Sequence, residues 1–378
     1  MIIGIDCSRT RSGGGLEHIT NLLNSYNPKL LGIKKIHLWV YESILKQLPK
    51  KNWLKIHTSK YIEGNLLKQI YWQKYILPKE AKKYKCSIFL NTDASTFLSF
   101  SPSVTMSRDA LSFEPGEMKR YWPSLKYLRL LIIKYIQIYS LKNANGTIFL
   151  TKYHKNLLEK FTGKLLNSKI IPHGIKTSFH NIAKNEFLPP EKIRFIYVSN
   201  IALYKHQWNV IYGLNTVSQK LNINFDLILI GGSDKGKAQK LLNNAILKKS
   251  NLLNVISLGH LKASEIIHNI KKSNFFIFAS SCETISNTLI QGMASGLPIA
   301  CSNRGPLPEV LGRGGIYFDP ENIKSIEKAV TKLIHDYNFR NRLVKEAQQR
   351  AIKYNWENCA KKTYLHLIKT YKDAKNVK

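Results

Sequence analysis

Short apolar runs alternate with amphipathic stretches along most of this 378-residue chain. The runs of the first half have the length and composition of buried strands; they are MIIGID, KKIHLWVY, CSIFLN, SVTMS, GTIFL and SKII. The second half repeats the pattern with RFIYVSN, FDLILIGG, NVISL, NFFIFAS, PIACS and GIYF. Strands that alternate with helices form parallel sheets covered on both faces. The sequence therefore predicts an α/β fold with two doubly wound, Rossmann-like domains.

The stretches between the runs have helical spacing. Helices are expected over 16–26, 63–77, 117–140, 207–220, 236–248, 263–272 and 287–295, and again after about residue 322. Periodicity lapses between residues 171 and 195, where a Pro-Pro pair ends a loop. We therefore expect an N-terminal domain over 1–180, a linker over 181–190, a C-terminal domain over 191–355, and a helix over 356–378 with packing against the N-terminal domain as one option. Ligands bind outside the carboxyl ends of parallel strands, so a site is expected in a cleft between the domains.

The charge balance is strongly basic, with 58 Lys and Arg against 24 Asp and Glu and a net charge of +34. The excess is spread along the chain, which is typical of a solvated surface and also compatible with an anionic membrane, an anionic substrate or nucleic acid. No nucleic-acid-binding motif accompanies it, so nucleic acid is not an expected partner.

The five cysteines are scattered and never spaced Cys-x-x-Cys, which argues against a disulfide framework or a cysteine-built zinc site. The first apolar run is short and followed by charges, which favours a buried strand over a signal peptide. No stretch approaches the roughly 18 apolar residues of a membrane span. A cytoplasmic protein is expected, soluble or peripheral to the membrane.

Three segments carry polar residues at expected strand ends. The first, SGGGLEHITNLL, has three glycines that let a ligand approach the start of a helix, although a tight turn without a ligand explains them too. The second, YVSNIALYKHQW, places Lys205 beside a helix start, where a diphosphate binds well and where a merely solvated lysine is equally common. His206 has no second ligand at metal spacing and is interpreted as structural.

The third segment runs from residue 281 to 312. Its helix, 287–295, places Asn287 and Gln291 one turn apart, and Gly296 and Pro298 end it. The first turn offers backbone amides to a phosphate, and Glu283 just before it has the chemistry to bind sugar hydroxyls. The sequence lacks an Asp-x-Asp pair and a Walker lysine, so neither a metal nor a cofactor is expected.

In chain order these residues resemble the retaining, metal-independent glycosyltransferases of the GT-B type, the glycosyl transferase group 1 class (family 4-like). The resemblance rests on GGG, IFLTKYHKNLL, IIPHGI, YVSN with YKHQW, LILIGG, ISLGHL and the segment from IFASSCET to GGIYFDPE, and it is densest over 275–321. In this class a Glu, seven residues and a second Glu precede an Ala-Met-Ala-x-Gly-x-Pro turn. Here Glu283, TISNTLI and Gln291 precede GMASGLP.

The resemblance implies roles for individual residues. Glu283 and Lys205 would be the catalytic pair, Glu283 on the hydroxyls of the donor sugar and Lys205 on its diphosphate. The implied donor-binding residues are Gly14, Gly15, Asn200, Leu261, Ser286, Asn287, Thr288 and Gln291. Arg108 and Asp109 would lie on the acceptor side. Three positions depart from the class: Gln291 replaces the ribose-binding Glu, Asn200 stands near a missing arginine, and Ser107 and Arg108 replace a usual histidine.

The implied activity is transfer of a sugar, with retention at the anomeric carbon, from a nucleotide-sugar to a saccharide or lipid-linked saccharide, in polysaccharide assembly at the cell surface. An epimerase of the same architecture and a non-catalytic nucleotide-sugar-binding protein are the alternatives. The expected helix 119–142 has the basic and aromatic profile of a membrane interface, although a core helix with a basic outer face has it too. Its residues are Lys126, Tyr127, Arg129, Leu131, Ile132, Lys134, Tyr135 and Tyr139.

Overall fold

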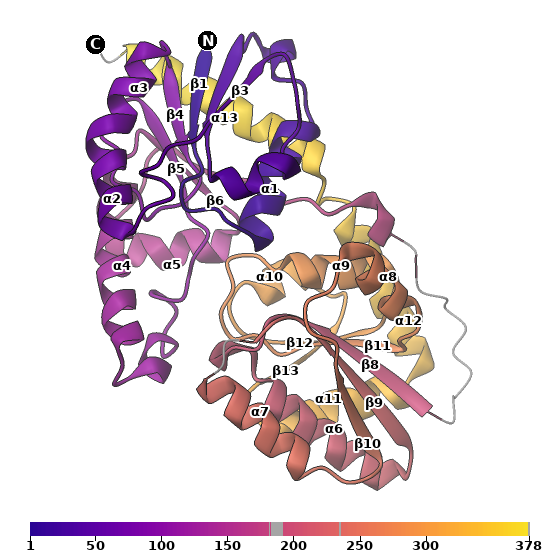
Figure 1. The fold of residues 1–378 in the computed structure, drawn as a ribbon. Coiled ribbons are helices and arrows are strands. Elements are labelled where there is room, and N and C mark those ends of the chain that lie inside the picture. The colour runs from indigo at the N-terminus through magenta and orange to yellow at the C-terminus, as the bar shows by residue number, and fades with distance from the viewer. Residues whose placement is uncertain (181, 183–191, 234–235, 377–378) are drawn as a thin grey trace. The chain divides into compact units, whose positions relative to one another are not determined.

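The computed structural model describes residues 1–180, 182, 192–233 and 236–376. Contacts divide the chain into two compact units, residues 1–174 with 355–378 and residues 175–354. Each unit is built on one parallel sheet with helices along it (Figure 1). The expected linker, 181–190, lies outside the described residues except for Ile182. The α/β fold with two Rossmann-like sheets is confirmed.

The first unit holds seven parallel strands among its described residues. Their order is β3 (Leu54–His57), β2 (Lys35–Trp39), β1 (Ile2–Asp6), β4 (Ile88–Asn91), β5 (Ser103–Met106), β6 (Gly146–Phe149) and β7 (Ser168–Ile170). Its helices are α1 (Gly13–Asn24), α2 (Leu66–Tyr71), α3 (Leu77–Lys83), α4 (Leu125–Asn143), α5 (Lys152–Thr162) and α13 (Trp356–Asn376). Ile3, Ile5, Ile36 and Leu38 are fully buried, as expected for strands covered on both faces.

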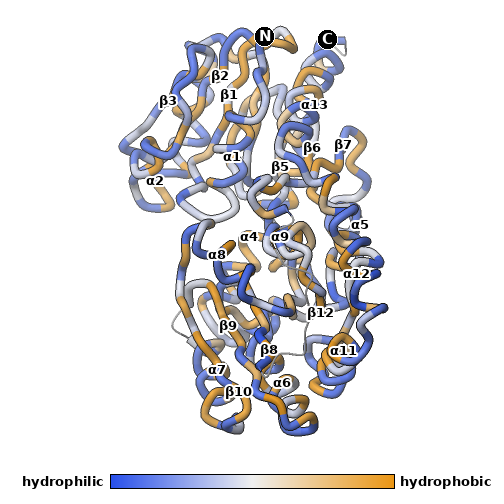
Figure 2. Tube along the Cα trace, turned by 90° about the vertical axis from the view of Figure 1, so that its right-hand side faces the viewer, coloured by the Kyte–Doolittle hydropathy of each residue, from blue (hydrophilic) through white to orange (hydrophobic). Residues whose placement is uncertain are grey.

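The second unit holds six parallel strands among its described residues. Their order is β10 (Leu253–Ser257), β9 (Asn224–Ile230), β8 (Lys192–Val198), β11 (Phe275–Phe278), β12 (Ile299–Ser302) and β13 (Ile316–Phe318). Its helices are α6 (Gln207–Leu221), α7 (Lys237–Leu247), α8 (Ala263–Lys271), α9 (Asn287–Ser295), α10 (Leu307–Leu311), α11 (Ile323–His335) and α12 (Tyr337–Ala351). Figure 2 shows β9 as a hydrophobic run, in keeping with the burial of its last six residues.

The last helix, α13, lies in the first unit although it follows the second in sequence. Its Tyr364 hydroxyl donates to the carbonyl of Leu22 on α1 at 3.0 Å. A Cβ on Gly174 would lie 2.2 Å from the nitrogen of Trp356, so only glycine permits the chain to pass this close to the start of α13. Packing against α1 therefore joins the two ends of the chain in one core.

One strand was missed, and two local predictions were wrong. Strand β3 was not expected, because LKIH at the sheet edge carries only two apolar residues. The stretch 63–77 is not one helix, since α2 passes through a π-helical turn, Trp72–Ile76, into α3. The helix expected from 117 begins at Leu125, because Pro123 disfavours helical backbone before it and Ser124 accepts from the Tyr127 amide as an N-cap.

None of the five cysteines, all in described segments, forms a disulfide. Among the described residues, no helix is long and apolar enough to cross a membrane.

Candidate functional site

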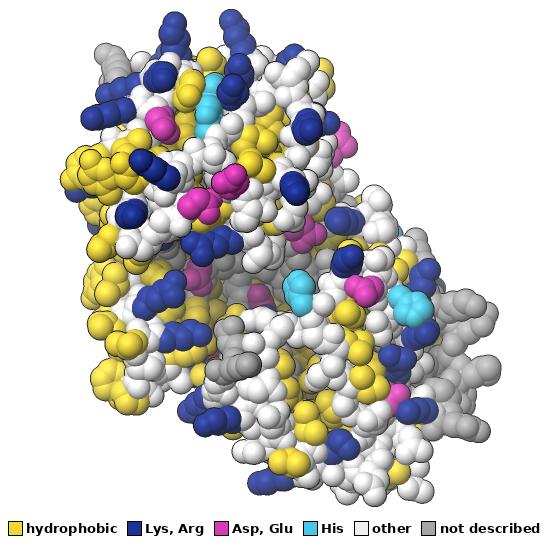
Figure 3. All heavy atoms as spheres, viewed as in Figure 1, with side chains coloured by type: hydrophobic (Ala, Val, Ile, Leu, Met, Phe, Trp, Pro, Cys, Tyr) yellow, Lys and Arg dark blue, Asp and Glu magenta, His cyan; other side chains and the backbone are white. Residues whose placement is uncertain are grey.

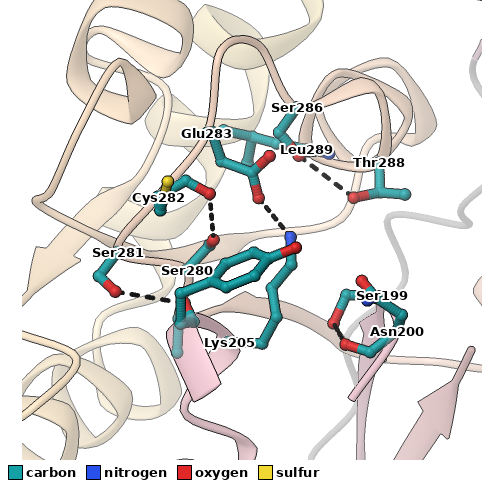
Figure 4. A network of polar contacts seen from close by, with 12 residues as sticks. Ser199, Asn200, Lys205, Ser280, Ser281, Cys282, Glu283, Ser286, Thr288 and Leu289 are labelled. Carbon is teal, nitrogen blue, oxygen red and sulfur yellow. Dashed lines mark hydrogen bonds and ion pairs between the residues drawn. The ribbon is translucent and has the colours of Figure 1, made fainter. Parts of the chain in front are cut away.

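The candidate site of the second unit lies where β8 and β11 end. These strands pair in parallel, so their carboxyl ends meet at the same edge of the sheet. Lys205 ends a short 3-10 turn, Leu203–Lys205, that follows β8. Glu283 stands in the loop between β11 and α9. Residues 78 positions apart in the sequence thereby face one another (Figure 4).

Lys205 Nζ forms an ion pair with Glu283 Oε1. The exposed fractions of the two side chains are 8% and 14%. Lys205 is therefore not a solvated lysine at a helix start, which was one reading of the sequence. Its ammonium also lies 5.1 Å from the ring centroids of Tyr204 and Phe278, which adds cation–π attraction. Lys205 and Glu283 are both largely dehydrated before any ligand arrives.

A buried scaffold fixes the backbone on both sides of this pair. The Tyr197 hydroxyl donates to the carbonyl of Lys205 at 2.6 Å and accepts from the amide of Ala279 at 3.1 Å. Ser281 donates its amide to the carbonyl of Tyr204 at 2.8 Å. The loops after β8 and β11 are therefore tied together independently of the ion pair. Tyr197 was not singled out in the sequence, because an aromatic residue in an apolar strand carries no sign of a polar role.

His206 follows Lys205 with a left-handed backbone, φ +48°, and a ring that is 1% exposed. Its Nε2 lies 2.8 Å from the Ser281 hydroxyl. The histidine therefore serves as a structural link between the two loops, as its sequence context suggested. No group of three His, Cys, Asp or Glu side chains in the described segments could hold a metal ion.

The first turn of α9 lies beside Glu283 (Figure 4). Ser286 is the N-cap, and its hydroxyl accepts from the amide of Leu289 and lies 3.2 Å from the Thr288 hydroxyl. Asn287 begins the helix. Its first turn carries no acidic side chain, so the positive end of the helix dipole is not neutralised from within the helix.

The remainder of α9 is packed tightly against the sheet. A Cβ on Gly292 would lie 2.9 Å from the ring of Phe276, so the helix approaches β11 closely. Gln291 is only 9% exposed, and its side chain makes no hydrogen bond to another described residue. Its expected position on a polar face is thus largely covered, while its amide group is left available to a ligand.

Glu283 also acts on groups that no ligand reaches. Burial raises the pKa of Tyr197 and of Cys301 well above their ordinary values, and the charge of Glu283 raises both further.

A Cβ on Gly305, in the turn after β12, would come within 3.9 Å of the Glu283 amide. That turn therefore also borders Glu283, and no motif in the sequence had pointed to Gly305.

Two expected donor-binding residues lie further along the same sheet edge. Asn200 follows β8 and is exposed, and its carbonyl accepts from the Gln207 side chain at 2.9 Å. Leu261 follows β10, which is two strands away from β8, and it is half-buried. Neither residue makes a described side-chain hydrogen bond with Lys205 or Glu283.

The remaining expected residues lie in the first unit, at the carboxyl ends of β1 and β5. Gly14 and Gly15 belong to the first turn of α1, and Arg108 and Asp109 follow β5. Arg108 Nη2 lies 3.3 Å from the Thr10 hydroxyl. Asp109 Oδ1 accepts from the amide of Leu111 at 2.9 Å, while burial raises its pKa and the Asp93 carboxylate raises it further.

Residues 178–350 match the family model of the group 1 glycosyl transferases. An uncharacterized glycosyltransferase of Methanocaldococcus jannaschii is 25% identical over 60% of each chain. O-antigen chain mannosyltransferase B of Escherichia coli is 26% identical over 28% of each chain. The chain thus matches between 28% and 60% of the length of these two curated relatives.

Solved structures share the fold across nearly the whole chain. Sucrose-phosphate synthase of Thermosynechococcus elongatus superimposes with a TM-score of 0.73 at 15% identity and covers 96% of this chain and 97% of its own. HepE of Anabaena, solved with UDP-glucose, gives 0.70 at 14% identity over 100% and 99%. WaaG, a glycosyltransferase of lipopolysaccharide biosynthesis, gives 0.70 at 12% identity over 97% and 99%. Residues 178–350 therefore belong with the group 1 glycosyl transferases, and the chain has the GT-B fold.

Proposed function

We propose that this protein transfers a sugar, with retention at the anomeric carbon, from a nucleotide-sugar to a saccharide or lipid-linked saccharide, in the assembly of cell-surface polysaccharide. The observation that carries the proposal is the buried pair of Lys205 and Glu283 beside the first turn of α9. A cation, a carboxylate and unneutralised helix amides at one strand edge match the diphosphate and hydroxyls of such a donor. The solved complex of HepE with UDP-glucose supports the same class of donor.

The proposed mechanism assigns charge stabilisation to Lys205 and α9. The leaving diphosphate gains negative charge as the glycosidic bond breaks, so a fixed ammonium and fixed amides stabilise the transition state more than the bound donor. Lys205 neutralises the diphosphate, which is the role that a divalent cation has in metal-dependent transferases. Because Tyr197 and Ser281 already hold the loops, little reorganisation accompanies the reaction.

Glu283 and Gln291 orient the donor in this proposal. Oε1 of Glu283 keeps its ion pair with Lys205, and the other carboxylate oxygen accepts hydrogen bonds from sugar hydroxyls. Gln291 meets the ribose, where an amide both donates and accepts but lacks the charge that strengthens such bonds. Asn200 and Leu261, at the same edge of the sheet, border the nucleotide. In the first unit, Arg108 and Asp109 meet the acceptor.

The first unit also offers a surface for an anionic membrane. Large apolar side chains are exposed on α4, on the turn before it and on the segment that begins with α2; they are Leu66, Leu67, Tyr71, Tyr75, Trp122, Leu125, Leu128, Ile132, Tyr135 and Tyr139. We call this set the apolar face. Figure 3 shows hydrophobic side chains gathered along the edge formed by these elements, with Lys and Arg close by.

The sequence between residues 119 and 142 contains six basic residues and no acidic one, which suits anionic headgroups. Lys126 and Arg129 are exposed there. Lys134 differs from the expectation, because it is half-buried and its ammonium lies 3.9 Å from the ring centroid of Phe161. We propose that the protein docks on the cytoplasmic face of the membrane through the apolar face, with Lys126 and Arg129 on the headgroups.

The donor site is tested by calorimetric titration with UDP-, GDP- and ADP-sugars without added metal. The wild-type chain is expected to bind one donor, and Lys205→Ala and Glu283→Ala are each expected to weaken binding by about tenfold or more. Lys220→Ala is the matched control, because Lys220 pairs with Glu327 in the same unit and its side chain is 62% exposed. Equal binding by all four proteins would reject the site.

Assays of nucleotide release and donor conversion distinguish a transferase from an epimerase and from a non-catalytic binding protein. A transferase releases nucleotide only when an acceptor is present, apart from slow hydrolysis. An epimerase would convert the donor sugar without an acceptor, and a non-catalytic binding protein would bind the donor and release nothing under either condition.

A further inference from the structure

Three arginines of the first unit come from two loops at one edge of its sheet. Arg9 and Arg11 lie between β1 and α1, and Arg108 follows β5, which is separated from β1 by β4 alone. Arg108 Nη2 lies 3.3 Å from the hydroxyl of Thr10, the residue between the other two arginines. We call these three residues the arginine cluster. Its long-range contacts do not follow from any spacing in the sequence.

Neutral groups hold Arg9 and Arg11 in place. Arg11 Nη2 donates to the Tyr41 hydroxyl at 2.9 Å, and its guanidinium lies 4.4 Å from the centroid of that ring. Arg9 Nη1 lies 3.5 Å from Oε1 of Gln69, and Gln69 donates to the same Tyr41 hydroxyl at 2.9 Å. Neither Arg9 nor Arg11 forms an ion pair with a carboxylate of the described residues. Their charges are positioned but not neutralised.

The nearby carboxylates are engaged elsewhere. Asp6 is buried and accepts from the Ser8 amide at 2.8 Å and from Gln73 Nε2 at 2.7 Å. Burial raises the pKa of Asp6, although these hydrogen bonds and the charge of Arg9 act in the opposite direction. Asp93 and Asp109 each accept from the backbone amide two residues further along, at 2.7 Å and 2.9 Å. None of the three is described as an ion-pair partner of Arg9 or Arg11.

The start of α1 adds positive potential at the same place. Its N-cap, Ser12, makes no side-chain hydrogen bond to the helix, and the first turn carries no acidic residue. A Cβ on Gly15 would lie 2.9 Å from Arg108 Nη1, so glycine lets the guanidinium approach this turn. The Nε of Arg9 is buried without a hydrogen-bond partner in the described structure.

We propose that the arginine cluster binds an anionic group, a phosphate or a carboxylate, carried by the acceptor. This inference rests on the proposed function, because the sugar acceptor is assigned to the first unit. Guanidinium groups bind both anions through paired N–H donors. The substrate class is thus narrowed to acceptors with a phosphate or an acidic sugar near the hydroxyl that receives the transferred sugar.

The test titrates the full-length chain with glycerol 3-phosphate at constant ionic strength. Glycerol serves as the uncharged analogue. The phosphate is expected to bind and to raise the unfolding midpoint, whereas glycerol does neither. Arg9→Gln/Arg11→Gln should weaken phosphate binding by about tenfold or more. Arg313→Gln/Arg342→Gln, which removes two exposed arginines of the second unit, is the charge-matched control and should bind like the wild type.

A second arm assigns the anion to the acceptor or to the donor. UDP binding should be unchanged in Arg9→Gln/Arg11→Gln and should not compete with glycerol 3-phosphate. If the double variant loses UDP binding as strongly, the cluster serves the donor diphosphate and the inference is wrong. Equal phosphate binding by the wild type and the double variant would also overturn it. Loss of UDP binding in Lys205→Ala reports on the donor site alone, so the two proposals fail separately.

Discussion

The hydroxyl of Tyr197 bridges Lys205 and Ala279: it donates to the Lys205 carbonyl at 2.6 Å and accepts from the Ala279 amide at 3.1 Å. Strands β8 and β11 are thus joined at the point where each turns toward the proposed donor site. Tyr197 is 1% exposed, so this oxygen cannot be replaced by bulk water. The position of the ammonium therefore depends on a hydroxyl that no ligand touches.

Tyr197→Phe is expected to reduce both stability and donor binding. The change leaves a carbonyl and an amide without their partner in a buried place, which costs about 1 to 3 kcal/mol. Urea unfolding measures the loss of stability, and calorimetry measures donor binding. Tyr317→Phe is the control, since that hydroxyl donates to the Gly312 carbonyl in the same unit. If Tyr197→Phe lowers stability but leaves donor affinity at the wild-type value, the hydroxyl supports the fold and does not position Lys205.

Lys205→Met is expected to destabilise the second unit. Removing one partner of a buried ion pair leaves the other charge buried and unpaired, which lowers the free energy of unfolding by about 3 to 5 kcal/mol. Because the Glu283 side chain is 14% exposed, we expect a loss at the lower end of that range. Lys205→Met/Glu283→Gln should recover part of that loss because no charge remains unpaired. Lys220→Met, which breaks an exposed pair, should cost about 1 kcal/mol or less. Additive losses in the double variant would show that the two residues are not coupled.

Much of the fold was predictable because parallel strands covered on both faces are continuous apolar runs, as β9 and β11 are. β3 was missed because an edge strand buries little and needs few apolar residues. Lys205 and Glu283 could be named from their motifs. Their mutual contact and burial could not be predicted, because these depend on the pairing of β8 with β11.

The contacts of the arginine cluster could not be predicted from the sequence either. Arg11 meets Tyr41, 30 positions away, and Arg9 meets Gln69, 60 positions away. Gln69 lies on α2 just before the π-helical turn, which no hydrophobic period predicts. Side-chain contacts between loops of different strands depend on topology, and one sequence without its fold does not reveal them.

Acid is expected to destabilise the first unit. Burial lowers the pKa of His18 well below its usual value, that of His154 to about 3 and that of His366 to about 4. These histidines therefore bind protons near pH 6.5 in the unfolded chain but stay neutral in the folded unit. Their contribution to the free energy of unfolding is fully present above that pH. It is lost as the pH falls toward 4, by about 1.4 kcal/mol per pH unit for each histidine.

Urea titrations between pH 7.5 and about 5 measure this loss, and tryptophan fluorescence follows the first unit because five of the six tryptophans lie in it. His18→Phe keeps a ring against His173, whose centroid lies 4.7 Å away, but cannot take up a proton. Its slope should be shallower by about one proton. The exposed His335 of the second unit provides the control, His335→Phe. Parallel curves for His18→Phe and the wild type would contradict the assignment.

Gly14 and Gly15 should respond differently to alanine although they are neighbours on α1. A Cβ on Gly14 meets nothing within 4 Å, so Gly14→Ala should stabilise the helix by about 0.5 to 1 kcal/mol. A Cβ on Gly15 meets Arg108 and Thr10, so Gly15→Ala should gain less or lose stability. In an Arg108→Ala background the difference between the two glycines should shrink. An unchanged difference, measured by urea unfolding, would mean that Arg108 does not limit the site.

The apolar face predicts binding to vesicles of phosphatidylcholine with phosphatidylglycerol and weak binding to phosphatidylcholine alone. Trp122, Leu125 and Tyr139 are 68%, 87% and 68% exposed, so replacing all three by serine removes apolar contact without opening the core. The triple variant should lose most vesicle binding in a sedimentation assay.

Lys126→Gln/Arg129→Gln tests the charge contribution to vesicle binding separately from the apolar one. Each basic residue near an anionic surface contributes about 1 kcal/mol, so this variant should weaken binding to anionic vesicles by about tenfold or more. Added salt should weaken the wild type in the same direction, because exposed charges are screened. The control for the apolar triple variant is Leu166→Ser/Leu247→Ser/Ile352→Ser. These side chains are 90%, 81% and 68% exposed but lie outside the apolar face. If the control set loses vesicle binding as much as the triple variant, exposed apolar area in general drives adsorption and the apolar face is not a docking surface.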